Sequence, residues 1–123
     1  MLTLLIALAC YEETACTDLA AASSLVHVVG PDGEPLVAEI SAVDEDGNPV
    51  EATCAGADPE ACTNWIVGYE VAGEIEITAT ADDGCNTGTG VVIVDVQMDE
   101  DGCHVVQQEA TLTVDEWTDL DCG

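Results

Sequence analysis

Residues 74–81 read Glu-Ile-Glu-Ile-Thr-Ala-Thr-Ala, a strict alternation of polar and apolar side chains. Successive side chains of a β-strand point to opposite faces of the sheet, so this alternation predicts a strand with one buried and one exposed face. The buried face is expected to carry Ile75, Ile77, Ala79 and Ala81. No segment shows a comparable 3.6-residue periodicity, and the sequence therefore predicts an all-β fold.

Six further segments around residues 74–81 have the length and composition of strands. They cover residues 25–29, 36–43, 49–54, 65–71, 91–96 and 106–114. Asp-Gly pairs, which tolerate the positive φ of tight turns, begin at Asp32, Asp46, Asp83 and Asp101. The run 91–96 is almost continuously apolar, which is typical of a strand covered on both faces. Seven short strands between turns predict an antiparallel two-sheet sandwich.

The composition is strongly acidic. The chain contains 26 Asp and Glu and no Lys or Arg, for a formal net charge of −26. Nucleic-acid binding depends on Lys and Arg that neutralise phosphates, so nucleic acid is excluded as a partner. There is likewise no basic patch for anionic lipid headgroups. Because the chain has no Phe, its core is expected to consist of Val, Ile, Leu and Ala.

The N-terminus has the features of a processing signal. Residues 1–9 are apolar but far shorter than the ~20 residues of a membrane span, and Ala7, Leu8 and Ala9 directly precede Cys10. This stretch resembles the lipobox of bacterial lipoproteins, whose cysteine is acylated and becomes the mature N-terminus. The resemblance implies a signal peptide over 1–9, a tether over 10–23 lipidated at Cys10, and a β-sandwich domain over 24–123. The alternative interpretation is a buried N-terminal strand.

Seven cysteines in a small chain indicate an oxidising compartment. With Cys10 used for lipid, six remain to pair. If consecutive strands alternate in direction, Cys16 and Cys103 fall at one end of the sandwich and the other four cysteines at the opposite end. A strand spans ~20 Å, whereas a disulfide needs Cα atoms within ~7 Å. We therefore predict that Cys16 bonds to Cys103.

The four remaining cysteines allow more than one pairing. Cys54 and Cys62 flank a short loop that contains Gly56, so their disulfide is the first expectation. This choice leaves Cys85 to bond to Cys122. The alternative joins Cys62 to Cys85. Each bridge in a small domain contributes a few kcal/mol, commonly ~2–4.

Two stretches resemble a known family of sandwich modules. Residues 30–35, Gly-Pro-Asp-Gly-Glu-Pro, lead into the strand 36–43, and residues 68–73, Gly-Tyr-Glu-Val-Ala-Gly, lead into 74–80. These features are similar to the carboxypeptidase-regulatory-like, transthyretin-like β-sandwich modules of bacterial lipoproteins. The resemblance implies an accessory or spacer module. Other immunoglobulin-like sandwiches stay open as alternatives.

Acidic residues also suggest a metal site. Asp44, Asp46 and Asn48 match the opening of an EF-hand calcium loop, but its twelfth position is Ala55 instead of the closing Glu. A plain Asp-Gly-Asn turn is therefore the preferred interpretation. A weaker calcium site at residues 44–48 or 99–101 is the alternative.

The histidines give a second metal hypothesis. His27, Cys103 and His104 could contribute to a metal cluster, but the chain has no Cys-x-x-Cys motif. Cys103 is better used in a disulfide in an oxidising compartment. The histidines are then ordinary strand residues.

Catalytic motifs are missing from the sequence. Ser occurs only at Ser23, Ser24 and Ser41, there is no Gly-x-Ser-x-Gly elbow, and no Lys or Arg could stabilise an oxyanion. The sequence predicts a non-catalytic, lipid-anchored structural or interaction module. Its expected place is the cell envelope, as an outer-membrane-anchored, surface or periplasmic lipoprotein, or the extracellular space. A calcium-dependent binding module and a small secreted hydrolase are the alternative functions.

Overall fold

The alternating segment forms strand β5 (Gly73–Asp82) in a computed structural model that describes residues 20–56, 58–82 and 86–119. Ile75, Ile77 and Ala79 are fully buried and Ala81 is nearly so. Glu74, Glu76, Thr80 and Asp82 are exposed on the opposite face. The predicted strand and its buried face are confirmed.

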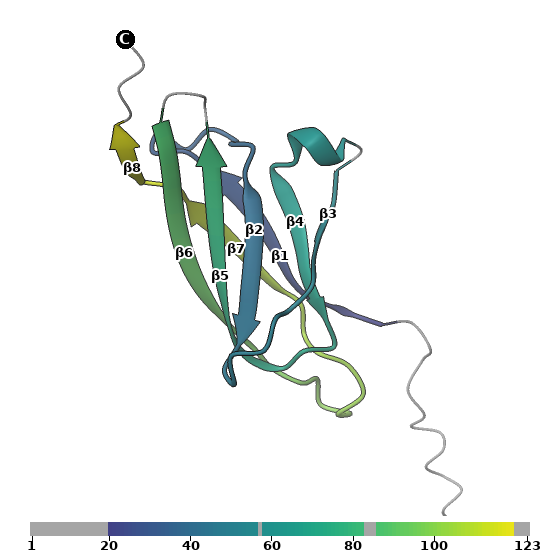
Figure 1. The fold of residues 1–123 in the computed structure, drawn as a ribbon. Coiled ribbons are helices and arrows are strands. Elements are labelled where there is room, and N and C mark those ends of the chain that lie inside the picture. Colours follow the sequence, from purple (N-terminus) through teal and green to yellow (C-terminus); the bar gives the residue numbers. More distant parts are fainter. Residues whose placement is uncertain (1–19, 57, 83–85, 120–123) are drawn as a thin grey trace, which may run out of the picture.

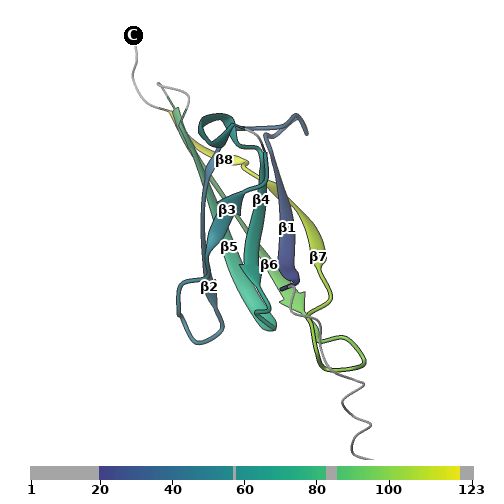
Figure 2. The same ribbon diagram turned by 90° about the vertical axis from the view of Figure 1, so that its right-hand side faces the viewer.

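Two four-stranded sheets pack face to face (Figures 1 and 2). The first has the order β3 (Ala52–Cys54), β4 (Asn64–Tyr69), β1 (Ala22–Val29) and β7 (Gln108–Thr113). The second has the order β2 (Glu39–Asp44), β5, β6 (Asn86–Val96) and β8 (Glu116–Asp119). Between β3 and β4 lies a short 3-10 helix, η1 (Pro59–Ala61). The all-β two-sheet sandwich is confirmed, and all seven predicted strands are present.

Two details of the topology differ from the expectation. The described residues contain an eighth strand, β8, and β1 runs parallel to β7 with Ser24 opposite Gln108. With alternating directions the first and seventh strands point the same way, so they are parallel once they become neighbours. Strand β8 is antiparallel to β6. It continues in the direction of β7 after the chain has crossed to the other sheet.

The core lies between the sheets and has the expected composition. Its buried apolar side chains are Val, Ile, Leu and Ala, together with Cys62. The largest of the fully buried side chains are Ile75, Ile77 and Leu112. Burial of this kind of surface is the main favourable term in folding.

Strand β6 is not covered on both faces, as its apolar run had predicted. Val94 and Val96 face the core, but Val91 is 57% and Ile93 58% exposed. These two side chains lie on the outer face of the second sheet, and no described element covers that face. An apolar run by itself does not show whether a strand is covered on both sides.

The described Asp-Gly turns agree with the prediction, but the domain begins slightly earlier than predicted. Strand β1 begins at Ala22, and Ser23 and Ser24 are fully buried, so the sandwich starts two residues before the predicted boundary. Gly33, Gly47 and Gly102 have positive φ, as the Asp-Gly turns require, whereas the pair at 83–84 lies outside the described residues. The predicted signal peptide and Cys10 lie outside them too. In the part that the structure describes, no helix is long and apolar enough to cross a membrane.

Candidate functional site

One edge of β6 lacks a strand partner over most of its length. Strand β5 pairs with β6 from Thr87 to Val96, but β8 pairs with the other edge only over Asn86–Thr89. No other described strand pairs with that edge from Gly90 onward. An unpaired edge presents backbone N–H and C=O groups that can bond to another extended chain.

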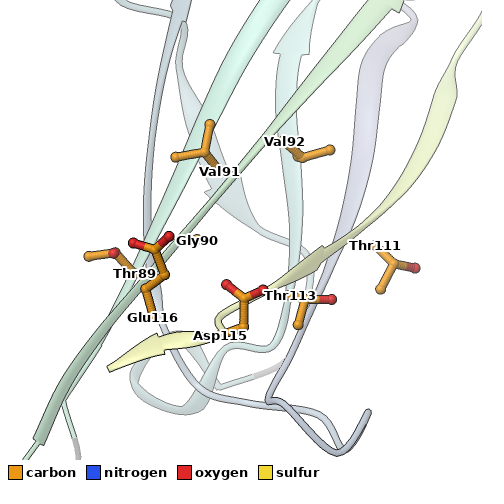
Figure 3. A pocket seen from close by; sticks show the side chains of 8 residues that line it. All are labelled: Thr89, Gly90, Val91, Val92, Thr111, Thr113, Asp115 and Glu116. Atoms are coloured by element: carbon orange, nitrogen blue, oxygen red, sulfur yellow. The ribbon is translucent and has the colours of Figure 1, made fainter. Parts of the chain in front are cut away.

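A groove of about 380 Å³ lies along this edge (Figure 3). It lies where β8 begins, at Glu116, and separates β6 from β7, which belongs to the other sheet. Its lining residues are Thr89, Gly90, Val91, Val92, Thr111, Thr113, Asp115 and Glu116. Figure 3 shows Val91 and Val92 on opposite sides of β6, so the groove follows the strand edge itself.

Two glycines of β6 let the end of β7 and the ring of Trp117 in β8 approach closely. A Cβ atom on Gly90 would lie 2.2 Å from the carbonyl oxygen of Thr113, and one on Gly88 would lie 2.6 Å from the ring of Trp117. The indole Nε1 of Trp117 donates a hydrogen bond to the carbonyl of Val114 at 3.1 Å. These contacts hold β8 on β6 and fix the position of the groove.

The groove and the neighbouring outer face combine apolar and acidic groups. On β5, Thr78 lies opposite Val91 and Glu76 opposite Ile93. At the groove itself, Asp115 and Glu116 are exposed. Because the chain has no Lys or Arg, no side chain other than the two histidines could neutralise these carboxylates. The chemistry fits an extended segment with apolar and cationic side chains.

Glu70 joins three separate parts of the chain. Its carboxylate accepts hydrogen bonds from the backbone N–H groups of Ala21 at 2.8 Å and Val105 at 3.0 Å, and it also bonds to Nδ1 of His104. Glu70 has a φ of 58°, which is unfavourable for a residue with a side chain. The three bonds offset this strain and tie the start of β1, the β4–β5 turn and the β6–β7 loop together.

The same bonds lower the pKa of Glu70. The hydrogen bond from the Ala21 backbone is the largest cause and the bond from His104 is the next, while partial burial opposes them. The pKa of this carboxyl therefore lies below its ordinary value of 4.5. A carboxyl whose pKa is lowered by folding stabilises the protein above its unfolded pKa, and this contribution disappears as the pH falls through the folded pKa.

Glu70→Gln is accordingly expected to lower Tm by several degrees at pH 7 and by less at pH 3. As the pH falls towards the folded pKa of Glu70, the wild-type carboxyl begins to take up a proton too, so the difference in Tm between the two proteins decreases. Thermal unfolding followed by circular dichroism at both pH values measures the difference. Glu109→Gln removes the same charge from an exposed position of β7 and serves as the control. An equal loss of Tm at both pH values for Glu70→Gln would contradict the ionic role of Glu70.

The acidic turns use their aspartates to hold the backbone. Oδ1 of Asp44 accepts hydrogen bonds from the N–H groups of Asp46 and Asn48, each at 2.9 Å. Oδ1 of Asp99 accepts one from Cys103 at 3.1 Å. Among the described residues no group of three or more His, Cys, Asp or Glu is placed to hold a metal ion. The turns therefore have a structural role, and a calcium site at 44–48 or 99–101 stays a prediction.

The two histidines lie near opposite ends of β4 instead of forming one site. His27 Nδ1 bonds to Oδ1 of Asn64, at the first residue of β4, at 2.5 Å. His104 bonds to Glu70, which directly follows the last residue of that strand. The structure does not bring His27 to Cys103 and His104 as a metal cluster would require.

The three described cysteines, Cys54, Cys62 and Cys103, lie at the predicted ends of the sandwich. Cys54 and Cys62 form a disulfide with a Cα–Cα distance of 5.9 Å, which confirms the first pairing and excludes Cys62 with Cys85. Cys103 is disulfide-bonded and precedes His104 at the end where β1 begins, as the alternation of strands predicted. The pairing with Cys16 lies outside the described residues.

The predicted pairing of Cys85 with Cys122 also lies outside the described residues. The Cys16–Cys103 and Cys85–Cys122 disulfides therefore stay predictions.

The groove itself was not predicted from the sequence. The sequence feature that could have indicated the groove is the segment Asn-Thr-Gly-Thr-Gly over residues 86–90. This segment places glycine at alternate positions on one face of a strand. Glycine inside a strand marks a close approach of another backbone. The approaching residues, Thr113 and Trp117, are distant in the sequence.

Comparison with protein-family models, curated proteins and solved structures found no match to this chain. The resemblance to carboxypeptidase-regulatory-like and transthyretin-like modules therefore stays a prediction from the sequence.

Proposed function

We propose that this protein is a non-catalytic interaction module of the cell envelope that captures an extended, basic segment of a partner protein. The observation that carries the proposal is the open edge of β6 from Gly90 to Val96, with Val91 and Ile93 exposed beside it. Strand addition to such an edge supplies affinity through main-chain hydrogen bonds and specificity through alternate side chains.

The charge of the chain favours a basic partner over a second copy. Each copy has a formal net charge of −26, so pairing two copies along β6 would bring two strongly acidic chains into contact. Like charges in contact across an interface are unfavourable. A segment with Lys or Arg would instead be attracted, and its apolar side chains could contact Val91 and Ile93.

A seven-residue peptide of alternating lysine and valine tests this site. We expect it to slow hydrogen exchange of the amides in residues 90–96 and to shift the methyl signals of Val91 and Ile93. Val91→Thr with Ile93→Thr should weaken binding about tenfold, equivalent to ~1.4 kcal/mol. The control, Met98→Thr with Val106→Thr, removes two exposed apolar side chains elsewhere and should leave the affinity unchanged.

Charge reversal separates local attraction from the overall charge. Asp115→Lys with Glu116→Lys and the control Asp32→Lys with Glu34→Lys each change the net charge by +4, from −26 to −22. The first pair should weaken peptide binding strongly and the second pair only slightly. Equal weakening would mean that the peptide senses only the total charge, and the proposed site would then be wrong.

The anchor is the second part of the proposal. Cys10 would carry the lipid, and residues 11–21 would connect it to the first strand at Ala22. Intact-mass analysis of the membrane fraction should find a chain that starts at Cys10 and carries lipid, and Cys10→Ser should release the protein. A soluble chain that retains Met1 would contradict the anchor.

A further inference from the structure

A second concavity, of about 600 Å³, lies at the end of the sandwich that carries the disulfide between Cys54 and Cys62. Both sheets contribute to its lining, with Trp65 from β4 and Ala81 from β5, and no residue lines both this cavity and the groove at β6. Its volume falls within the range of ~300–1,000 Å³ that is typical of small-molecule sites. The buried, disulfide-bonded Cys62 lines it too, so part of its wall is rigid.

Three carboxylates stand around this cavity. Glu39 at the start of β2, Glu60 in η1 and Asp82 at the end of β5 line it, and all three residues are exposed. These elements meet at one end of the sandwich (Figure 1). Neither histidine lines the cavity and the chain has no Lys or Arg, so the lining contains no cationic side chain. An apolar interior with a negative rim suits an organic cation.

Trp65 is the aromatic residue of the cavity, and its position is costly. The side chain is partly buried and packs against the core. Its indole Nε1 is buried and has no hydrogen-bond partner among the described residues. A buried donor without a partner costs free energy that Phe or Leu would avoid at this position. Tryptophan is also the aromatic side chain that attracts cations most strongly through its ring face. Binding of a cation on this face would account for a tryptophan at this position.

We propose that this cavity binds an organic ammonium group on an apolar stem. The ammonium group would contact the face of Trp65 and the surrounding carboxylates, and the stem would pack against Ala81 and Cys62. A free alkylamine and a lysine side chain of a partner protein share this chemistry. The site is independent of the groove at β6, because the two have no residue in common.

Titration with n-butylammonium chloride, followed by NMR of the ligand and of the Trp65 indole signal, tests the cavity. We expect saturable binding with butylammonium and none with sodium chloride at equal ionic strength or with n-butanol. Trp65→Leu should abolish binding, whereas Trp65→Phe should retain it with a several-fold loss, since Phe keeps a weaker ring face. The Phe variant also keeps the test valid if the Leu variant does not fold.

The carboxylates have a matched control. Glu39→Gln with Glu60→Gln should weaken butylammonium binding several-fold, while Glu74→Gln with Glu76→Gln, which removes the same charge from the exposed face of β5, should not. A lysine tetrapeptide with blocked termini shows whether the ligand is a lysine side chain of a partner protein or a free amine. Binding at least tenfold tighter than butylammonium indicates a partner's lysine side chain, and equal or weaker binding indicates a free amine. Equal responses to butylammonium and butanol, or binding that survives Trp65→Leu, would overturn the proposal.

Discussion

Replacing Ile77 with alanine is expected to lower the free energy of unfolding by about 2–5 kcal/mol, the range for truncating a buried isoleucine. Ile77 is 0% exposed in the middle of β5, and the strands on both sides, β2 and β6, hold it in place. The removed methyl and methylene groups would leave a cavity that neighbouring strands cannot fill completely. A loss of this size is a large fraction of the ~5–15 kcal/mol that stabilises most domains.

Ile93→Ala is the matched control for this substitution. It removes the same groups from the same sheet, but Ile93 is 58% exposed on β6. We expect a change within about 0.5 kcal/mol, as for most surface substitutions. Urea unfolding measures the free energy of unfolding of both variants. The comparison requires that the slope of this free energy against urea concentration stays unchanged. If both variants lost the same stability, the outer face of β6 would be covered in solution, and the docking surface proposed there would already be occupied.

Strand β5 could be predicted because its burial follows the period of the backbone. Ile75 and Ile77 alternate with Glu74 and Glu76, so one face must be buried whatever the rest of the chain does. The same reasoning failed for residues 91–96, because an apolar run does not show which elements cover its second face. Strand β8 was missed because four residues carry little periodicity. It is held by the ring of Trp117 over Gly88, a contact between distant residues.

The functional residues were harder to predict than the fold for a related reason. Glu70 occupies a turn in the sequence, but its role depends on hydrogen bonds from Ala21 and Val105, which only the folded chain brings together. Asp44 and Asp99, by contrast, act on residues within five positions of themselves, and the preferred interpretation of Asp44 as a turn residue agrees with its local hydrogen bonds. Local hydrogen bonding could be inferred from the sequence, whereas the groove and the cavity depend on how the sheets meet.

Gly90→Ala is expected to destabilise the protein by about 1–3 kcal/mol, the usual cost of overpacking a close contact. The added Cβ would lie 2.2 Å from the backbone oxygen of Thr113 and 2.8 Å from Cδ2 of Leu112. A backbone atom cannot rotate away as a flexible side chain can, so β7 must move from β6. This movement would widen the groove between the two strands, and the lysine–valine peptide should bind less tightly even where the variant is folded.

Gly30→Ala separates this steric effect from the general effect of replacing glycine. Gly30 is also buried and also outside the positive-φ region, but a Cβ there would meet its nearest atom, Oδ1 of Asp32, at 3.6 Å, which is ordinary contact. An alanine at a compatible position restricts the unfolded chain and is neutral or slightly stabilising. We therefore expect Gly30→Ala to keep or raise Tm and Gly90→Ala to lower it clearly. If the two variants unfolded at the same temperature, the contact of Thr113 with β6 would be loose in solution, and the groove would be a variable gap instead of a formed site.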